Sequence, residues 1–108
     1  MALRWSEPAV DDVQAIHSYI ARDSAAHAER VVRALMRAAE GLARLPYTGH
    51  ASHDVAGVRE RPLARWRYTL IYRVVADLRA ETGEADIAIV RVLGPGQQVA
   101  ATAVQEPS

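Results

Sequence analysis

The sequence has 108 residues, of which 50% are hydrophobic and 24% are charged, so it has room for one compact domain with a single core. Thirteen arginines balance 13 acidic residues, and a chain of zero net charge lacks the positive field that draws in nucleic acids without further specificity. The absence of cysteine excludes disulfides and thiolate catalysis.

A short strand followed by a helix is predicted at the N-terminus. Residues 2–5 suit a strand, and Ser6 can cap a helix whose first turn contains Pro8, where a missing N–H costs nothing. The apolar face of this helix is formed by Ala9, Val13, Ile16 and Ile20. Acidic residues within residues 1–13 are unlike the basic start of a signal peptide, and no segment has the length of a membrane span. We therefore expect a cytoplasmic protein.

A second helix is predicted to begin after Asp23 and Ser24 and to end near Leu45, because Pro46 cannot continue it. The short connection implies an antiparallel hairpin of helices. Its predicted buried stripe consists of Ala28, Val31, Val32, Leu35, Ala39 and Leu42. The opposite side carries Arg30, Arg33, Arg37, Glu40 and Arg44. Such a stripe is usually a solvated face, but it also suits contact with an acidic partner.

After a polar loop at residues 46–57, the apolar pattern changes to a period of two. Strands are predicted at residues 58–63, 66–75 and 85–93, with a tight turn at Ala64 and Arg65 and a longer polar turn around residues 81–84. These strands form an antiparallel meander. The last strand is apolar on both sides, which predicts an interior position in the sheet.

Alternation along residues 66–75 predicts which side of the sheet meets the helices. The face toward the helices consists of Trp66, Tyr68, Leu70, Tyr72 and Val74. The opposite face consists of Arg67, Thr69, Ile71, Arg73 and Val75. The predicted core contains Val13, Ile16, Ile20, Val31, Leu35, Leu42, Tyr68, Leu70, Tyr72 and Ile89. The tail, residues 94–108, has Glu106 as its single charge, and we expect it to be mobile or ordered only by a partner.

Several short motifs occur in a defined order along the chain. The first helix contains Asp12, Ile16 and the pair Tyr19-Ile20, and the exit of the second contains Leu42, Pro46 and Gly49. Together with Trp5, GVRERPL and WRYTLIYRVV, these motifs resemble the ParE branch of the RelE/ParE toxin superfamily. The resemblance covers about residues 3–93. It implies one α+β domain within residues 1–93, with an N-terminal strand, a two-helix hairpin and a three-stranded antiparallel meander in one sheet.

The resemblance also implies a function, that of a ParE-type toxin from a type II toxin-antitoxin module of the kind associated with plasmid stabilisation. Such toxins bind DNA gyrase and stabilise its cleaved DNA complex. A cognate antitoxin neutralises them by covering the helical hairpin and a sheet edge, so we expect a hetero-oligomer that contacts operator DNA only through the antitoxin. The residues expected to bind the antitoxin are Arg30, Arg33, Arg37, Arg59 and Arg61. The residues expected to bind the target are Arg65, Arg67, Arg73 and Arg91.

Two alternatives remain open: a RelE-type ribosome-dependent mRNA endonuclease, and an inactive family member that serves as a binding module or co-repressor. Cleavage needs a general base and acid beside an anion-stabilising cluster, and we expect no histidine or lysine on the sheet. The pair Gly49-His50 and the segment GPGQQ lack the positive charge that RelE-type ribonucleases keep at these places. We therefore predict no catalytic residue and no cofactor.

Three polar residues of the loop at residues 46–57 raise the question of a metal site. The spacing of His50, His53 and Asp54 is compatible with metal binding. Three polar residues in a loop are more typical of turn formation, so no metal is expected.

Overall fold

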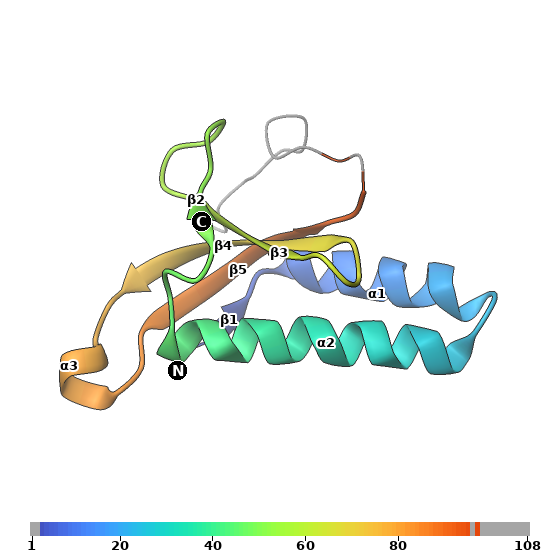
Figure 1. Cartoon of the computed structure of the whole chain (residues 1–108), viewed down its shortest axis with the longest axis horizontal. Coiled ribbons are helices and arrows are strands. Elements are labelled where there is room, and N and C mark those ends of the chain that lie inside the picture. The colour runs from blue at the N-terminus through green and yellow to red at the C-terminus, as the bar shows by residue number, and fades with distance from the viewer. Residues whose placement is uncertain (1–2, 96, 98–108) are drawn as a thin grey trace.

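Two antiparallel helices pack against one face of a five-stranded sheet in the computed structural model, which describes residues 3–95 and 97 (Figure 1). The elements are β1 (Leu3–Trp5), α1 (Glu7–Ala21), α2 (Ala25–Arg44), β2 (His50–Ala51), β3 (Arg59–Leu63), β4 (Tyr68–Ala76), α3 (Arg79–Thr82) and β5 (Asp86–Leu93). The strand order is β1-β5-β4-β3-β2, with β1 parallel to β5 and the other pairs antiparallel. The predicted α+β class, helical hairpin and meander are confirmed. Strand β2 and helix α3 were not predicted.

Serine side chains cap both long helices. Ser6 Oγ and Ser24 Oγ each accept, at 3.1 Å, from the backbone N–H three residues further on. Each serine thereby satisfies a donor that the first helical turn leaves unpaired. Helix α2 ends at Arg44, because Pro46 disfavours the helical conformation in the residue before it. Both helices therefore lie where their caps and the proline predicted.

Side chains of Ser6 and of α1 bind the part of β5 that β1 does not reach. Strand β1 pairs with β5 only as far as Ile89. Beyond that point, Ser6 Oγ donates to Val90 O at 2.8 Å, and the Asp12 carboxylate accepts from Val92 N at 2.9 Å. Side chains of the helical segment thus bind backbone groups that a longer neighbouring strand would have paired.

Strand β4 begins at Tyr68, later than predicted, because the turn from β3 extends to Arg67. The N–H groups of Trp66 and Arg67 both donate to Leu63 O, at 3.0 and 2.8 Å. Arg67 has a φ of 67°, a left-handed conformation that lies outside the strand region. The predicted alternation therefore applies from Tyr68 onward but not to Trp66 and Arg67.

The main core lies between the helices and the sheet, as predicted. The predicted core residues that are buried are Val31, Leu35, Leu42, Leu70, Tyr72 and Ile89. Those that are partly buried and pack against this cluster are Val13, Ile16, Ile20 and Tyr68. Trp66 also packs on it from the turn. The face assigned to Leu70 and Tyr72 is therefore confirmed.

A second, smaller cluster on the opposite face of the sheet was not predicted. It consists of Val58, Ile71, Val90 and Leu93, with Val55 packed against it. The register of β4 and β5 shifts between Ile71 and Tyr72, where β5 has one extra residue and bulges. The bulge changes the alternation, so Val92 joins the larger cluster and Leu93 the smaller one. Strand β5 serves both clusters because it lies inside the sheet, as its apolar pattern predicted.

The predicted tail falls mostly outside the described part of the chain, at residues 96 and 98–108. Within the described part, Gly94 N donates to the side-chain oxygen of Gln97 at 2.6 Å. Among the described residues, no helix is both long and apolar enough to cross a membrane.

Candidate functional site

The α2 arginines that are expected to bind an antitoxin lie on one exposed side of the helix. Arg30, Arg33 and Arg37 are all exposed, and spacings of three and four residues place them above one another. Val31 and Leu35, which alternate with them in the sequence, are buried in the main core. The structure therefore brings these three guanidinium groups together on a solvent-facing surface, which we call the α2 stripe.

The turn between β3 and β4 forms a second cationic surface, which we call the hairpin tip: Arg65, Trp66 and Arg67. The guanidinium carbon of Arg65 lies 4.9 Å from the centroid of the Trp66 ring, and the His27 ring of α2 lies 5.8 Å from it. Trp66 is half-buried, whereas Arg65 and Arg67 are exposed. The Arg61 side chain donates to the neighbouring Pro62 O. Trp66 thus anchors the tip on α2 while two arginines face solvent.

Arg59 and Arg73, which were predicted to bind partners, hold loops in place. Arg73 Nη1 donates to Gly57 O at 3.0 Å, and Arg59 Nη2 donates to Gly49 O at 2.7 Å. Gly57 has a φ of 81°, and a Cβ there would lie 2.7 Å from Arg73 Nη1. The prediction that Arg67 and Arg73 share one face of a strand is wrong, because Arg67 belongs to the turn.

Arg91 forms a bidentate ion pair with Asp12 of α1. Arg91 Nε lies 2.7 Å from Oδ2 and Nη2 lies 2.9 Å from Oδ1, and the two side chains are only 20% and 16% exposed. The hydrogen bond to this carboxylate raises the pKa of Arg91, against the opposing effect of burial. The pair fastens α1 to β5. Arg91 therefore has a structural role beside the target-binding role predicted for it.

The sheet carries a histidine at its edge, contrary to expectation. His50 lies in β2 opposite Glu60 of β3, and the His53 ring stacks on it with centroids 6.4 Å apart. The expectation was wrong because β2 falls in a segment whose composition is that of a loop. Within residues 3–95 and 97, no group of three or more His, Cys, Asp or Glu side chains is arranged to hold a metal ion.

Tyr72 anchors the exit of α2, a role that the sequence pattern did not predict. Its hydroxyl donates to Pro46 O at 2.7 Å and accepts from Gly49 N at 3.1 Å. A Cβ on Gly49 would lie 2.4 Å from Glu60 O, so only glycine fits there. The available signal was the motif of Leu42, Pro46 and Gly49, because its last two residues supply the backbone groups that Tyr72 binds.

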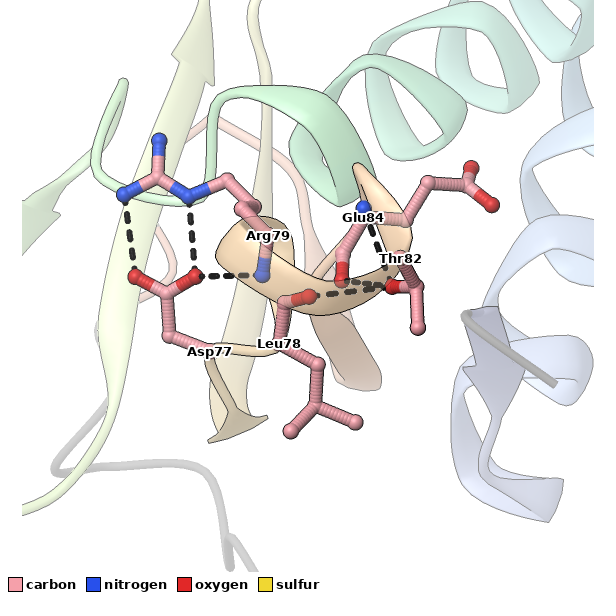
Figure 2. A network of polar contacts seen from close by, with 5 residues as sticks. All are labelled: Asp77, Leu78, Arg79, Thr82 and Glu84. Atoms are coloured by element: carbon pink, nitrogen blue, oxygen red, sulfur yellow. Dashed lines mark hydrogen bonds and ion pairs between the residues drawn. The ribbon is translucent and has the colours of Figure 1, made fainter.

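A compact polar network fixes α3, in the region predicted only as a polar turn (Figure 2). Arg79 donates to the Asp77 carboxylate from Nε and from Nη2, each at 2.9 Å. The Thr82 hydroxyl lies at hydrogen-bonding distance, 3.0 Å, from both Leu78 O and Glu84 O. The connection from β4 to β5 is therefore a defined helical turn.

Comparison with known proteins agrees with this architecture. Residues 3–99 match the sequence model of a family described as ParE toxin of type II toxin-antitoxin system, parDE. The chain belongs to the ParE toxin family. A solved structure described as the chromosomal ParDE TA system from P. aeruginosa is 26% identical with a TM-score of 0.67, and the match covers 85% of this chain and 92% of that chain. Among curated proteins no match was found.

The two ParE motifs noted in the sequence both hold the fold together. Asp12, from the first motif, binds Arg91 and the backbone of β5. Pro46 and Gly49, from the second, bind Tyr72. In this chain both motifs therefore have a structural role, and the exposed arginines are the candidates for an interaction surface.

Proposed function

We propose that this member of the ParE family is a cytoplasmic toxin that inhibits DNA gyrase by binding it, and that a cognate antitoxin neutralises it. Family membership and the similar solved structure, which is described as a ParDE system, support the toxin and its antitoxin partner. Gyrase as the target follows from the resemblance to the ParE branch. In this proposal the chain acts through surface contacts and neither makes nor breaks a covalent bond.

The hairpin tip is the observation that carries the proposal. The segment between Glu60 and Asp77 contains the hairpin tip and Arg73, and it has no carboxylate. A chain of zero net charge therefore concentrates positive charge in one place. Arginine stays protonated, so it can bind phosphate or carboxylate groups but cannot readily accept a proton. Such a surface suits binding to a protein–DNA complex better than cleavage of RNA.

The antitoxin is proposed to cover the α2 stripe and the neighbouring sheet edge at Arg59 and Arg61. Strand β2 pairs with β3 only at Arg59 and Glu60, so the outer side of β3 is otherwise unpaired by a strand within the described residues. An exposed strand edge can accept an added strand from a partner. Contact with operator DNA is proposed to occur only through the antitoxin.

An mRNA endonuclease is the second candidate, and one observation favours it. His50 and Glu60 lie opposite each other, and imidazole and carboxylate groups are those that general acid–base catalysis uses. They pair near the Arg59 end of β3, however, whereas the hairpin tip follows its other end at Leu63. This separation of the candidate proton-transfer groups from the tip favours the binding function.

The test compares two activities of one preparation. We expect the purified chain to inhibit gyrase supercoiling, to increase cleaved DNA and to leave mRNA intact in the presence of ribosomes. Codon-positioned mRNA cleavage that is lost in His50→Ala, with supercoiling unaffected, would instead establish the endonuclease. Inactivity in both assays, with tight antitoxin binding retained, would establish a binding module or co-repressor.

A further inference from the structure

The exposed ring of Tyr47 lies against two guanidinium groups from distant parts of the chain. The Cζ atoms of Arg59 in β3 and Arg79 in α3 lie 5.1 and 5.6 Å from its centroid. Tyr47 is 52% exposed, and nearby Leu45 is 64% exposed. We call Leu45, Tyr47, Arg59 and Arg79 the Tyr47 corner. It lies where α2 exits toward β2 and where β4 passes into α3.

Both guanidinium groups of the Tyr47 corner are held by further bonds. Arg79 is bound at two nitrogens by Asp77, and Figure 2 shows its remaining nitrogen directed away from that carboxylate. The hydrogen bond to Asp77 raises the pKa of Arg79, so the side chain keeps its charge. Arg59 is bound to Gly49 O at 2.7 Å. A partner would therefore meet side chains that are already ordered, and binding would cost little conformational entropy.

Tyr47 differs from an ordinary exposed tyrosine of the same chain. Tyr19 on α1 is 68% exposed, and within the described residues no cation lies over its ring. Ordered aromatic and arginine side chains are the ones that dominate the binding energy of protein interfaces. The Tyr47 corner therefore has the composition and rigidity of an interface anchor.

The chemistry around the Tyr47 corner selects a protein segment rather than a nucleic acid. Leu45 and Tyr47 offer apolar surface, and the remaining nitrogen of Arg79 can donate to a carboxylate. The α3 region itself is acidic, with Asp77, Glu81, Glu84 and Asp86. These carboxylates oppose the approach of a phosphate backbone. An apolar side chain next to a single carboxylate fits this surface.

Continuity with the α2 stripe indicates the origin of that segment. Arg44 lies on the same side of α2 as Arg30, Arg33 and Arg37, and Leu45 follows it directly. The distance from Arg30 to Arg44 along the helix is about 21 Å at 1.5 Å per residue. We propose that the Tyr47 corner docks the continuation of the antitoxin segment that lies along α2, with an apolar side chain on Tyr47 and a neighbouring carboxylate on Arg79. This inference rests on the proposed contact between the antitoxin and α2.

The test measures the affinity of the full chain for its purified cognate antitoxin. Tyr47→Ala and Arg79→Ala are each expected to weaken binding about tenfold, because each removes part of an ordered anchor. The loss in Arg79→Ala should shrink at high salt. Val75→Ala and Arg4→Ala, the controls for an exposed apolar side chain and an exposed arginine outside the helical hairpin, should stay within about twofold of the wild type. Thermal melts of the free variants verify that each one is folded.

Three outcomes would overturn the assignment. If Tyr47→Ala and Arg79→Ala bind normally while the combined Arg30, Arg33 and Arg37 variant binds weakly, the Tyr47 corner is no docking site and the proposed function stands. If Val75→Ala loses as much affinity as Tyr47→Ala, the loss is not specific to the Tyr47 corner. If the wild-type chain does not bind the antitoxin, the proposed function and the docking site both fall.

Discussion

Tyr72 shows how a single side chain can serve both the core and a loop. Its ring is completely buried, and its hydroxyl binds Pro46 O and Gly49 N in the segment after α2. The buried hydroxyl takes the place of water as the hydrogen-bond partner of one backbone C=O and one backbone N–H. Its removal would leave both backbone groups without that partner.

We expect Tyr72→Phe to lower the free energy of unfolding by about 1–3 kcal/mol, because the ring is kept while two buried backbone groups lose their partner. Tyr68→Phe is the matched control on the same strand. Its hydroxyl makes no hydrogen bond within the described residues, so its loss should be at most about 0.5 kcal/mol. Urea denaturation followed by tryptophan fluorescence measures both, and equal losses would contradict the anchoring role.

The variant Leu70→Ala tests how β4 packs on the helices. Leu70 is 0% exposed in the main core, so its truncation should cost about 2–5 kcal/mol of unfolding free energy. That is a large part of the about 5–15 kcal/mol that a small domain has in total. Val75→Ala, at a position on the same strand that is 65% exposed, should cost no more than about 0.5 kcal/mol. Similar losses at the two positions would contradict the face assignment.

Between elements, the attachment of α1 to the sheet depends on Asp12. Its carboxylate accepts from Arg91 Nε, from Arg91 Nη2 and from Val92 N. Strand pairing cannot supply these contacts, because β1 ends opposite Ile89. The side chains are mostly shielded from water, so the ion pair is screened less than one at the surface.

A double-mutant cycle tests this attachment. We expect Asp12→Ala to lower the free energy of unfolding by about 2–3 kcal/mol and Arg91→Ala by less, because Val92 N keeps its acceptor in the second variant. The coupling energy between the two sites should be about 1–2 kcal/mol. Urea denaturation of the single and double variants gives this value. Additive losses would mean that the ion pair between Asp12 and Arg91 contributes nothing to holding α1 in place.

Over the whole molecule, the α2 stripe connects two proposed contact regions. At its start, His27 lies one turn before Arg30 and packs on Trp66 of the hairpin tip. Further along the same side of α2, Arg44 leads into the Tyr47 corner. The helical layer on which the stripe lies covers only one face of the sheet (Figure 1). An antitoxin along α2 would therefore reach the hairpin tip and would compete there with the proposed target.

The stripe is tested by replacing Arg30, Arg33 and Arg37 together with alanine. Affinity for the antitoxin should fall at least about tenfold at low salt and by a smaller factor at physiological salt, because exposed charges are screened. The unfolding free energy should change little, since these side chains are exposed. Calorimetric titration at both salt concentrations makes the measurement. Unchanged affinity at both would mean that the stripe is only a solvated face.

The hairpin tip is tested by Arg65→Ala combined with Arg67→Ala. The concentration needed to inhibit gyrase supercoiling should rise about tenfold or more, because two exposed guanidinium groups are lost while Trp66 still anchors the turn. Arg4→Ala combined with Arg22→Ala is a control that removes the same charge elsewhere. If this control loses as much inhibition, general charge rather than the hairpin tip is responsible.

The sequence alone determined the features that depend on local chemistry. Ser6, Ser24 and Pro46 predicted the helix boundaries, because caps and a missing N–H act within one turn. Periodicity predicted the faces that Leu35 and Leu70 bury, because side-chain direction follows from the backbone repeat. The motifs spread over these elements were specific enough to indicate the ParE family.

Features that depend on residues far apart in the chain are evident only from the packed structure. Strand β2 exists because β3 pairs with it, and its two residues have no periodicity to detect. The bond between Arg91 and Asp12 joins positions 79 residues apart, and the Tyr47 corner gathers side chains from three separate segments. In the sequence, nothing distinguishes an arginine that binds another residue from one that is solvated. Whether one binds a loop, an aspartate or solvent is settled by distances that arise only when the sheet and helices have packed, since hydrogen bonds and ion pairs act over a few ångströms.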